Sequence, residues 1–167
     1  HGGSGCVSGR SGFLPYAGIL MQQGNLERCL RELGCAIIPV TGTSMWPLLQ
    51  QGRSRVQLAA RNGSPLKAGD VVLYRRADGT LVLHRIVLVE GADTCWLCGD
   101  HQWKHLEQVH DEQIVAVAQA FFRNGHLVDE HTGWYRLYRF LWTRNLTIRR
   151  CCLALLRWSG LEKHSLG

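Results

Sequence analysis

Residues 70–90, DVVLYRRADGTLVLHRIVLVE, indicate the fold class of this chain. Two apolar, β-branched runs at 70–75 and 81–90 flank the tripeptide Ala77-Asp78-Gly79, which is typical of a hairpin turn. We therefore predict a β-hairpin whose second strand carries His84.

Segments on both sides of this hairpin continue the β pattern. Apolar or alternating runs predict further strands at residues 36–40, 55–59, 94–98, 113–122 and 126–128. Turn signals such as Asn124-Gly125 separate these runs. Short strands joined by tight turns indicate a mainly β core, either barrel-like or sandwich-like.

Two segments outside these strands have helical periodicity. Residues 25–33 place their leucines on one face, and Gly34 follows where a C-terminal cap is expected. Residues 134–158 predict a basic C-terminal helix, broken or weakened near 145–147. We interpret residues 1–20 as a tag or linker with a doubtful extension, 21–132 as the β domain, and 133–167 as a C-terminal basic, aromatic segment.

Composition favours one globular domain with a tail. The chain has 167 residues, of which 46% are hydrophobic and 19% charged, and its net charge is +6. Residues 133–161 contain arginines but no acid, so the remainder of the chain has a net charge close to zero. The β domain therefore has no basic surface of the kind that binds nucleic acid, and no nucleic-acid partner is expected. Seven cysteines, an odd number, indicate reduced thiols and a cytoplasmic protein. No apolar run approaches the ~20 residues of a membrane span.

Three residues have the types that nucleophilic catalysis needs. Ser44 lies in a turn of small residues, His84 in a strand, and Asp100 at a strand end. A serine hydroxyl becomes a nucleophile when a base takes its proton, and histidine does this near neutral pH. A carboxylate can then fix the imidazole tautomer and stabilise the imidazolium.

The order of these motifs resembles the S24/S26 serine peptidases, which include type I signal peptidases and LexA-like self-cleaving repressors. The run GTSMWP at 42–47 resembles the nucleophile box, and GDVV at 69–72 resembles the second box. His84-Arg85 and Gly99-Asp100 are similar to the base box and the last box. The resemblance covers about residues 38–117 and implies the signal peptidase/LexA-like β fold.

The resemblance also implies roles for individual residues. Ser44 would be the nucleophile and His84 the base, as in archaeal and endoplasmic-reticulum signal peptidases. Bacterial leader peptidases and LexA-like proteins use lysine as the base instead. Asp100 would complete the site, with Glu107 as the reserve candidate because the last box continues here with His101-Gln102. Residues that would contact the substrate or the oxyanion are Gly42, Thr43 and Met45.

The function implied is a serine endopeptidase that cleaves an extended leader or signal peptide of a precursor. Neither a cofactor nor a metal is expected. The alternatives are a non-enzymatic peptide-binding module on the same fold and a self-cleaving regulator.

Two further patterns have rival interpretations. Cys95 and Cys98 with His101 and His105 are residue types that bind zinc, but cysteines three apart in a strand face opposite sides, which favours buried structural thiols.

In the segment 134–158, we expect a helix that packs on the β core and leaves its arginines in water. A peripheral contact with an anionic membrane or a partner protein ranks next, and RNA last.

Overall fold

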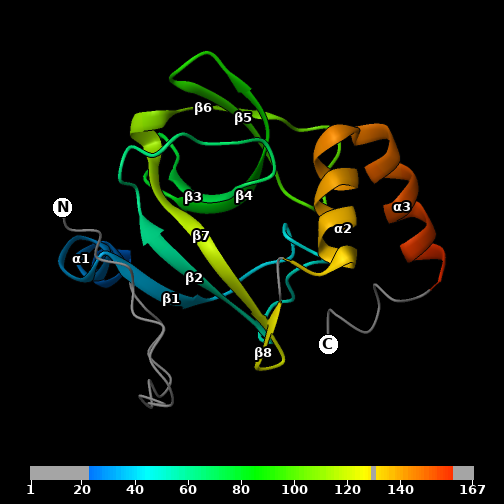
Figure 1. Cartoon of the computed structure of the whole chain (residues 1–167), viewed down its shortest axis with the longest axis horizontal. Coiled ribbons are helices and arrows are strands. Elements are labelled where there is room, and N and C mark those ends of the chain that lie inside the picture. The colour runs from blue at the N-terminus through cyan, green and yellow to red at the C-terminus, as the bar shows by residue number, and fades with distance from the viewer. Residues whose placement is uncertain (1–22, 129–130, 160–167) are drawn as a thin grey trace.

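The computed structural model describes residues 23–128 and 131–159, and these form an antiparallel β-sheet with helices at two sides (Figure 1). In chain order the elements are α1 (Gln23–Leu33), β1 (Cys35–Pro39), β2 (Ser54–Ala60), β3 (Val71–Arg75), β4 (Leu81–Glu90), β5 (Thr94–Cys98), β6 (Glu107–His110), η1 (Asp111–Gln113), β7 (Ile114–Arg123), β8 (His126–Val128), α2 (Gly133–Arg144) and α3 (Leu146–Trp158). The mainly β class is therefore confirmed.

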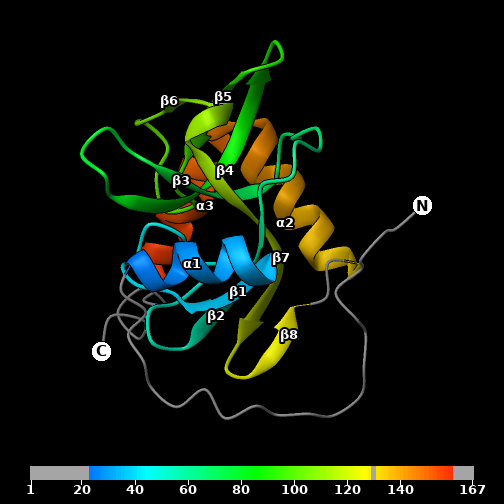
Figure 2. The same ribbon diagram turned by 90° about the vertical axis from the view of Figure 1, so that its left-hand side faces the viewer.

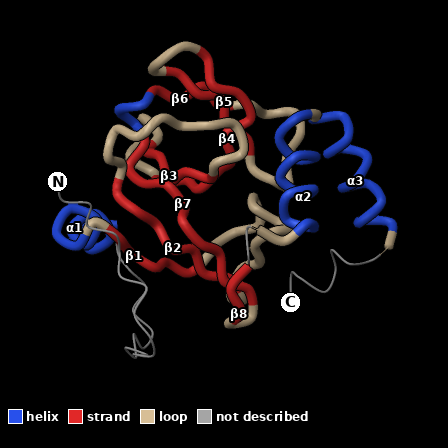
Figure 3. The backbone as a smooth tube through the Cα atoms, in the orientation of Figure 1, coloured by secondary structure: helices blue, strands red, loops and turns tan. Residues whose placement is uncertain are grey.

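The strands join in the order β1-β2-β7-β3-β4-β5-β6, and β8 pairs with β7. Every pairing is antiparallel, and the sheet does not close, so a closed barrel is ruled out. In Figure 3 the strands lie between α1 on one side and the α2–α3 pair on the other, and Figure 2 shows α1 in front with α2 and α3 behind.

The central hairpin forms as its sequence predicts. β3 and β4 pair so that Val72 lies opposite His84 and Tyr74 opposite Val82. The turn between them is closed at Gly79, which has a φ of +84° that favours glycine. Tyr74 and His84 are thereby diagonal neighbours on the same face of the sheet.

The helices also match their predicted positions. α1 ends at Leu33 and is followed by Gly34 with a φ of +71°, the left-handed cap that the sequence indicates. The C-terminal segment is two helices divided at Asn145, whose side chain accepts hydrogen bonds from the N–H groups of Thr147 and Ile148. Within the described residues, no helix is both long and apolar enough to cross a membrane.

The apolar core consists of clusters that fasten the loops near Ser44. Met45 lies in the large cluster that α1, β1, β2, β3 and β7 share. A separate cluster unites Trp46 of the same loop with Trp142 of α2 and Leu153 of α3. The C-terminal helices therefore pack on the loop that carries Ser44, as well as on the sheet.

Candidate functional site

Ser44 lies at the surface in the loop between β1 and β2, and the two residues that follow it are buried. Ser44 is partly exposed, whereas Met45 and Trp46 are buried at 2% and 5% exposure. The N–H of Trp46 donates to the carbonyl of Thr43 at 3.1 Å, which closes the turn around the serine. Burial of the two large side chains thus holds the Ser44 backbone in place.

Backbone N–H groups at this turn suit a developing oxyanion. Among the described residues, none accepts a hydrogen bond from the N–H of Ser44 or of Met45. The N–H of Gly42 is instead taken by Oε1 of Gln51 at 3.0 Å. Of the predicted oxyanion residues, Met45 therefore offers a free donor, while Gly42 shapes the turn through its φ of +76°.

His84 and Ser44 meet across Gly99. The ring of His84 is buried at 2% exposure on β4. A Cβ atom built on Gly99 would stand 3.2 Å from Nε2 of His84 and 3.2 Å from Cβ of Ser44, so those two atoms are at most twice that distance apart. No hydrogen bond joins Oγ to Nε2 among the described residues, and catalytic pairs are often loose without substrate.

The other ring nitrogen of His84 faces Tyr74. The Tyr74 hydroxyl lies 3.2 Å from Nδ1 of His84 and donates to Oε2 of Glu107 at 2.7 Å. Since this hydroxyl has one proton, its oxygen accepts from Nδ1–H. A neutral imidazole with its proton on Nδ1 has its lone pair on Nε2, the nitrogen beside Ser44.

Glu107 is kept ionised by Arg76. Nε of Arg76 donates to Oε2 of Glu107 at 2.8 Å, and Nη2 donates to Oε1. These bonds lower the pKa of Glu107. Oε1 of Glu107 also lies 3.8 Å from Nδ1 of His84, so a negative charge stands behind the imidazole.

Burial sets the protonation state of His84. Removal from water lowers the pKa of His84 to about 4, although the charge of Glu107 opposes the shift. The imidazole is therefore neutral at pH 7, as a general base must be.

Asp100 does not contact His84 in the way that the resemblance implied, because its carboxylate is paired with Arg85. It is fully buried, and Nε and Nη2 of Arg85 donate to its two carboxylate oxygens, each at 2.8 Å. The Tyr138 hydroxyl donates to Oδ2 as well, at 2.8 Å. No hydrogen bond links Asp100 to His84 in the described residues, so the carboxylate behind the imidazole is Glu107, the reserve candidate.

The C-terminal helices clamp the turn at residues 99–102. Nε1 of Trp142 donates to the carbonyl of Asp100 at 2.9 Å. Arg149 is fully buried, and Nη1 donates to the carbonyls of Gly99 and Gln102 at 2.9 and 3.0 Å. The expectation that the arginines of this segment stay in water is thus wrong for Arg149, because the carbonyls of the turn need its donors.

The cysteine pair is part of the interior. Cys95 and Cys98 of β5 are buried at 3% and 0% exposure, as expected of structural thiols, and burial raises the pKa of both. The described residues contain no group of three or more His, Cys, Asp or Glu side chains placed to hold a metal ion.

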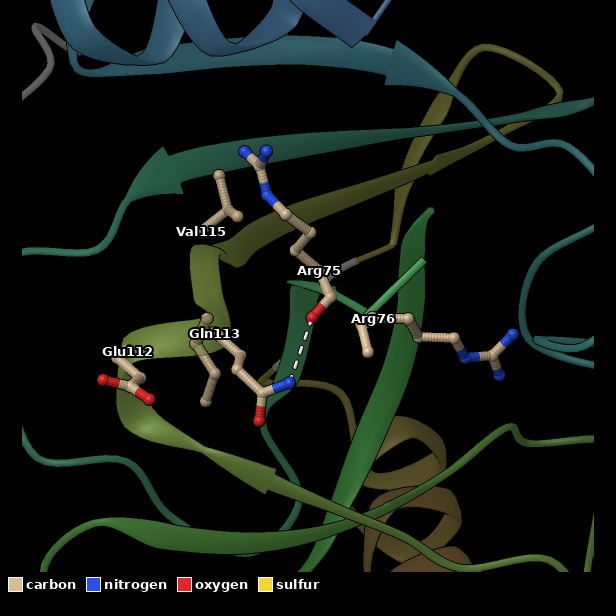
Figure 4. A pocket seen from close by; sticks show the side chains of 7 residues that line it. Arg75, Arg76, Glu112, Gln113 and Val115 are labelled. Carbon is tan, nitrogen blue, oxygen red and sulfur yellow. Dashed lines mark hydrogen bonds between the residues drawn. The ribbon is translucent and has the colours of Figure 1, made fainter. Parts of the chain in front are cut away.

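A separate cavity of about 570 Å³ lies between the end of β3 and the start of β7 (Figure 4). Its lining includes Arg75, Glu112 and Gln113, and Nε2 of Gln113 donates to the carbonyl of Arg75 at 3.2 Å. The side chains of Arg75 and Arg76 point in different directions in this view. Arg76 also lines this cavity, but neither Ser44 nor His84 does, so we assign the cavity no part in the Ser44–His84 pair.

Tyr74 and Arg76 are site residues that our sequence analysis missed. The hairpin register contained a signal for Tyr74, because a residue that pairs with Val82 is a diagonal neighbour of His84. For Arg76 and Arg149 no local signal exists, since their partners lie 31 and 50 residues away in the chain.

Comparisons with known proteins provide no independent assignment. No family model matches the chain, and no curated protein matches it. The chemistry of the site therefore rests on its residues and their geometry.

Proposed function

We propose that this chain is a serine endopeptidase of the S24/S26 type, with Ser44 as nucleophile and His84 as general base. The observation that carries the proposal is the approach of Ser44 Cβ and His84 Nε2 to one point, the Cβ position of Gly99. The tautomer argued from Tyr74 supports it, because it leaves the Nε2 lone pair on the side of the serine.

The reaction follows from these positions. Nε2 of His84 takes the proton of Ser44 Oγ as the oxygen attacks the scissile carbonyl carbon. The N–H groups of Ser44 and Met45 are free to stabilise the oxyanion. The imidazolium gives its proton to the leaving amine as the C–N bond breaks, and a water molecule then releases the acyl group by the same steps in reverse order.

The substrate we propose is an extended segment of a precursor, such as a leader or signal peptide. Among the described strands, β1 pairs only with β2, and it runs directly into the Ser44 loop. Ile37 of β1 is 52% exposed, so a substrate strand could pair beside it without unfolding the sheet. Small side chains just before the cut are expected, because the oxyanion site lies close to the turn.

A peptide-pool experiment tests the proposal. The chain is incubated with a pool of unstructured synthetic peptides, and products are identified by mass spectrometry for the original chain, for Ser44→Ala and for the exposed control Ser64→Ala. We expect recurrent cleavage sites that disappear only in Ser44→Ala. Cleavage that persists in a folded Ser44→Ala would refute the proposal.

The same experiment separates the alternatives. Peptides retained on the immobilised chain without any cleavage would instead indicate a binding module. Fragmentation of the chain itself, followed as intact mass over time, would indicate a self-cleaving regulator.

A further inference from the structure

Tyr74 occupies the position behind His84 that a carboxylate was expected to fill. Its side chain is buried at 1% exposure, and its ring centroid lies 5.9 Å from that of His84. The hydroxyl lies within hydrogen-bond distance of both Nδ1 of His84 and Oε2 of Glu107. Among the hydrogen bonds of the described residues, no other group bridges these two side chains.

We propose that Tyr74 is a positioning residue for His84, and that Glu107, held by Arg76, acts on the imidazole through the Tyr74 hydroxyl in place of Asp100. This inference rests on the proposed function, since it assigns the base its orientation. The site is then a Ser–His pair supported by the hydrogen-bond chain from His84 through Tyr74 to Glu107, which we call the Tyr–Glu relay. Asp100 is paired with Arg85 instead.

The direction of each hydrogen bond follows from the ionisation of Glu107. A carboxylate only accepts hydrogen bonds, and Arg76 only donates them. The Tyr74 proton must therefore point to Glu107, and burial with that bond raises the pKa of Tyr74, so the hydroxyl stays protonated. Its oxygen is left to accept from His84 Nδ1, which excludes the tautomer with the proton on Nε2.

The relay also matters once His84 has taken a proton. The imidazolium donates from both nitrogens, and the Tyr74 oxygen continues to accept from Nδ1. The charge of Glu107, 3.8 Å from Nδ1, stabilises the new positive charge. No proton needs to leave Tyr74 or reach Glu107 in this scheme.

Charged groups surround His84 from several elements, and they do not all favour the charged imidazole. Glu107 of β6 and Asp100 after β5 raise its pKa, while Arg76 after β3 and Arg149 of α3 lower it. If the negative charge of Glu107 is removed, less negative charge remains to offset the effect of the two arginines on the pKa of His84. Glu107→Gln should therefore lower the pKa of His84 further.

Nitrogen NMR of histidine-labelled protein tests the relay without using peptidase activity. The ring signals of His84 are assigned by their loss in His84→Gln. We expect the Nδ1–H tautomer in the original chain and a shift toward a mixture with Nε2–H in Tyr74→Phe, which keeps the ring and removes the hydroxyl. Tyr138→Phe is the matched control, because it also removes a tyrosine bond to a carboxylate but should not change the His84 tautomer.

Kinetics supply the second readout. We expect Tyr74→Phe to lower kcat by about 10–100-fold with little change in KM, by analogy with the range found for partners that orient metal-binding histidines. If Tyr74→Phe does not fold, Glu107→Gln serves instead, since that side chain is 30% exposed. It should lower the pKa of His84 in the NMR titration.

The outcomes distinguish this inference from the proposed function. An Nε2–H tautomer in the original chain, or no change in Tyr74→Phe, would overturn the relay even if Ser44-dependent cleavage occurs. The expected tautomer without any Ser44-dependent cleavage would keep the hydrogen-bond chain and overturn the peptidase proposal.

Discussion

Gly99 lies so close to Ser44 that a Cβ atom on Gly99 would stand 2.6 Å from the carbonyl oxygen of Ser44. The same carbonyl accepts a hydrogen bond from the N–H of His101 at 2.9 Å. Two loops far apart in the sequence are thus docked backbone against backbone. Any side chain at residue 99 would push the serine away from His84.

Gly99→Ala should therefore disable the site. We expect a loss of about 1–3 kcal/mol in the free energy of unfolding, typical of overpacking, and a large drop in peptide cleavage. Denaturant unfolding and the peptide-pool assay measure the two effects. Gly24→Ala is the control, because a Cβ at Gly24 would meet nothing within 4 Å. Full activity in Gly99→Ala would show that the contact between the loops is dispensable.

The low pKa of His84 predicts how stability depends on pH. An unfolded histidine takes up a proton near pH 6.5, whereas His84 in the folded chain does so near 4. The unfolded state therefore binds more protons between these values, and stability falls as the pH is lowered from about 6.5 to 4. The part of this loss that His84 causes should be about 3 kcal/mol, so His84→Gln should lose less stability by that amount, as measured by urea unfolding at several pH values. An equal loss in His84→Gln would assign it to other groups.

Activity should follow the same group. We expect kcat/KM to decline on the acid side near pH 4, where His84 becomes protonated, and not near neutrality as an ordinary histidine would give. The measurement is the cleavage rate of one peptide substrate across this pH range. A decline centred at pH 6.5 would contradict the buried environment of His84.

Replacing Asp100 should lower the free energy of unfolding more than it slows the catalytic step. Asp100→Asn leaves Arg85 buried without its charge partner, which costs about 3–5 kcal/mol in comparable pairs. Asp93→Asn, at an exposed turn, should have little effect on the free energy of unfolding. A stable Asp100→Asn protein with a slow reaction would instead support the role that the resemblance implied.

The outer surface of the C-terminal helices predicts binding to anionic vesicles. Trp134, Leu137 and Phe140 of α2 are each more than half exposed, and residues 133–161 contain arginines but no acid. We expect binding to vesicles with phosphatidylglycerol that weakens as salt rises, and less binding for Phe140→Ser. Neutral phosphatidylcholine vesicles are the control. No binding to either kind at low salt would contradict the prediction.

Much of the fold was predictable because it depends on local pattern. The β3–β4 hairpin, the cap at Gly34 and the break near Asn145 all have their signals within a few residues. β6 was missed because its sequence EQVH buries only Val109 and therefore lacks an apolar run.

The site was predictable only in part. Ser44 and His84 stand in recognisable motifs, but the partners of a carboxylate depend on which strands and helices meet. Asp100 pairs with Arg85, 15 residues earlier, and the partner of Tyr74 is Glu107 on a strand that the sequence did not indicate. Such pairings become visible only in three dimensions.

The central claim is that Ser44 and His84 act as one unit, and a double-variant cycle tests it most directly. The measurement is kcat/KM for Ser44→Ala, His84→Gln and the double variant, with folding checked by circular dichroism. We predict that each single change abolishes nearly all cleavage and that the double variant loses no more than either. Single changes whose effects multiply, or a single variant that keeps its activity, would contradict the claim.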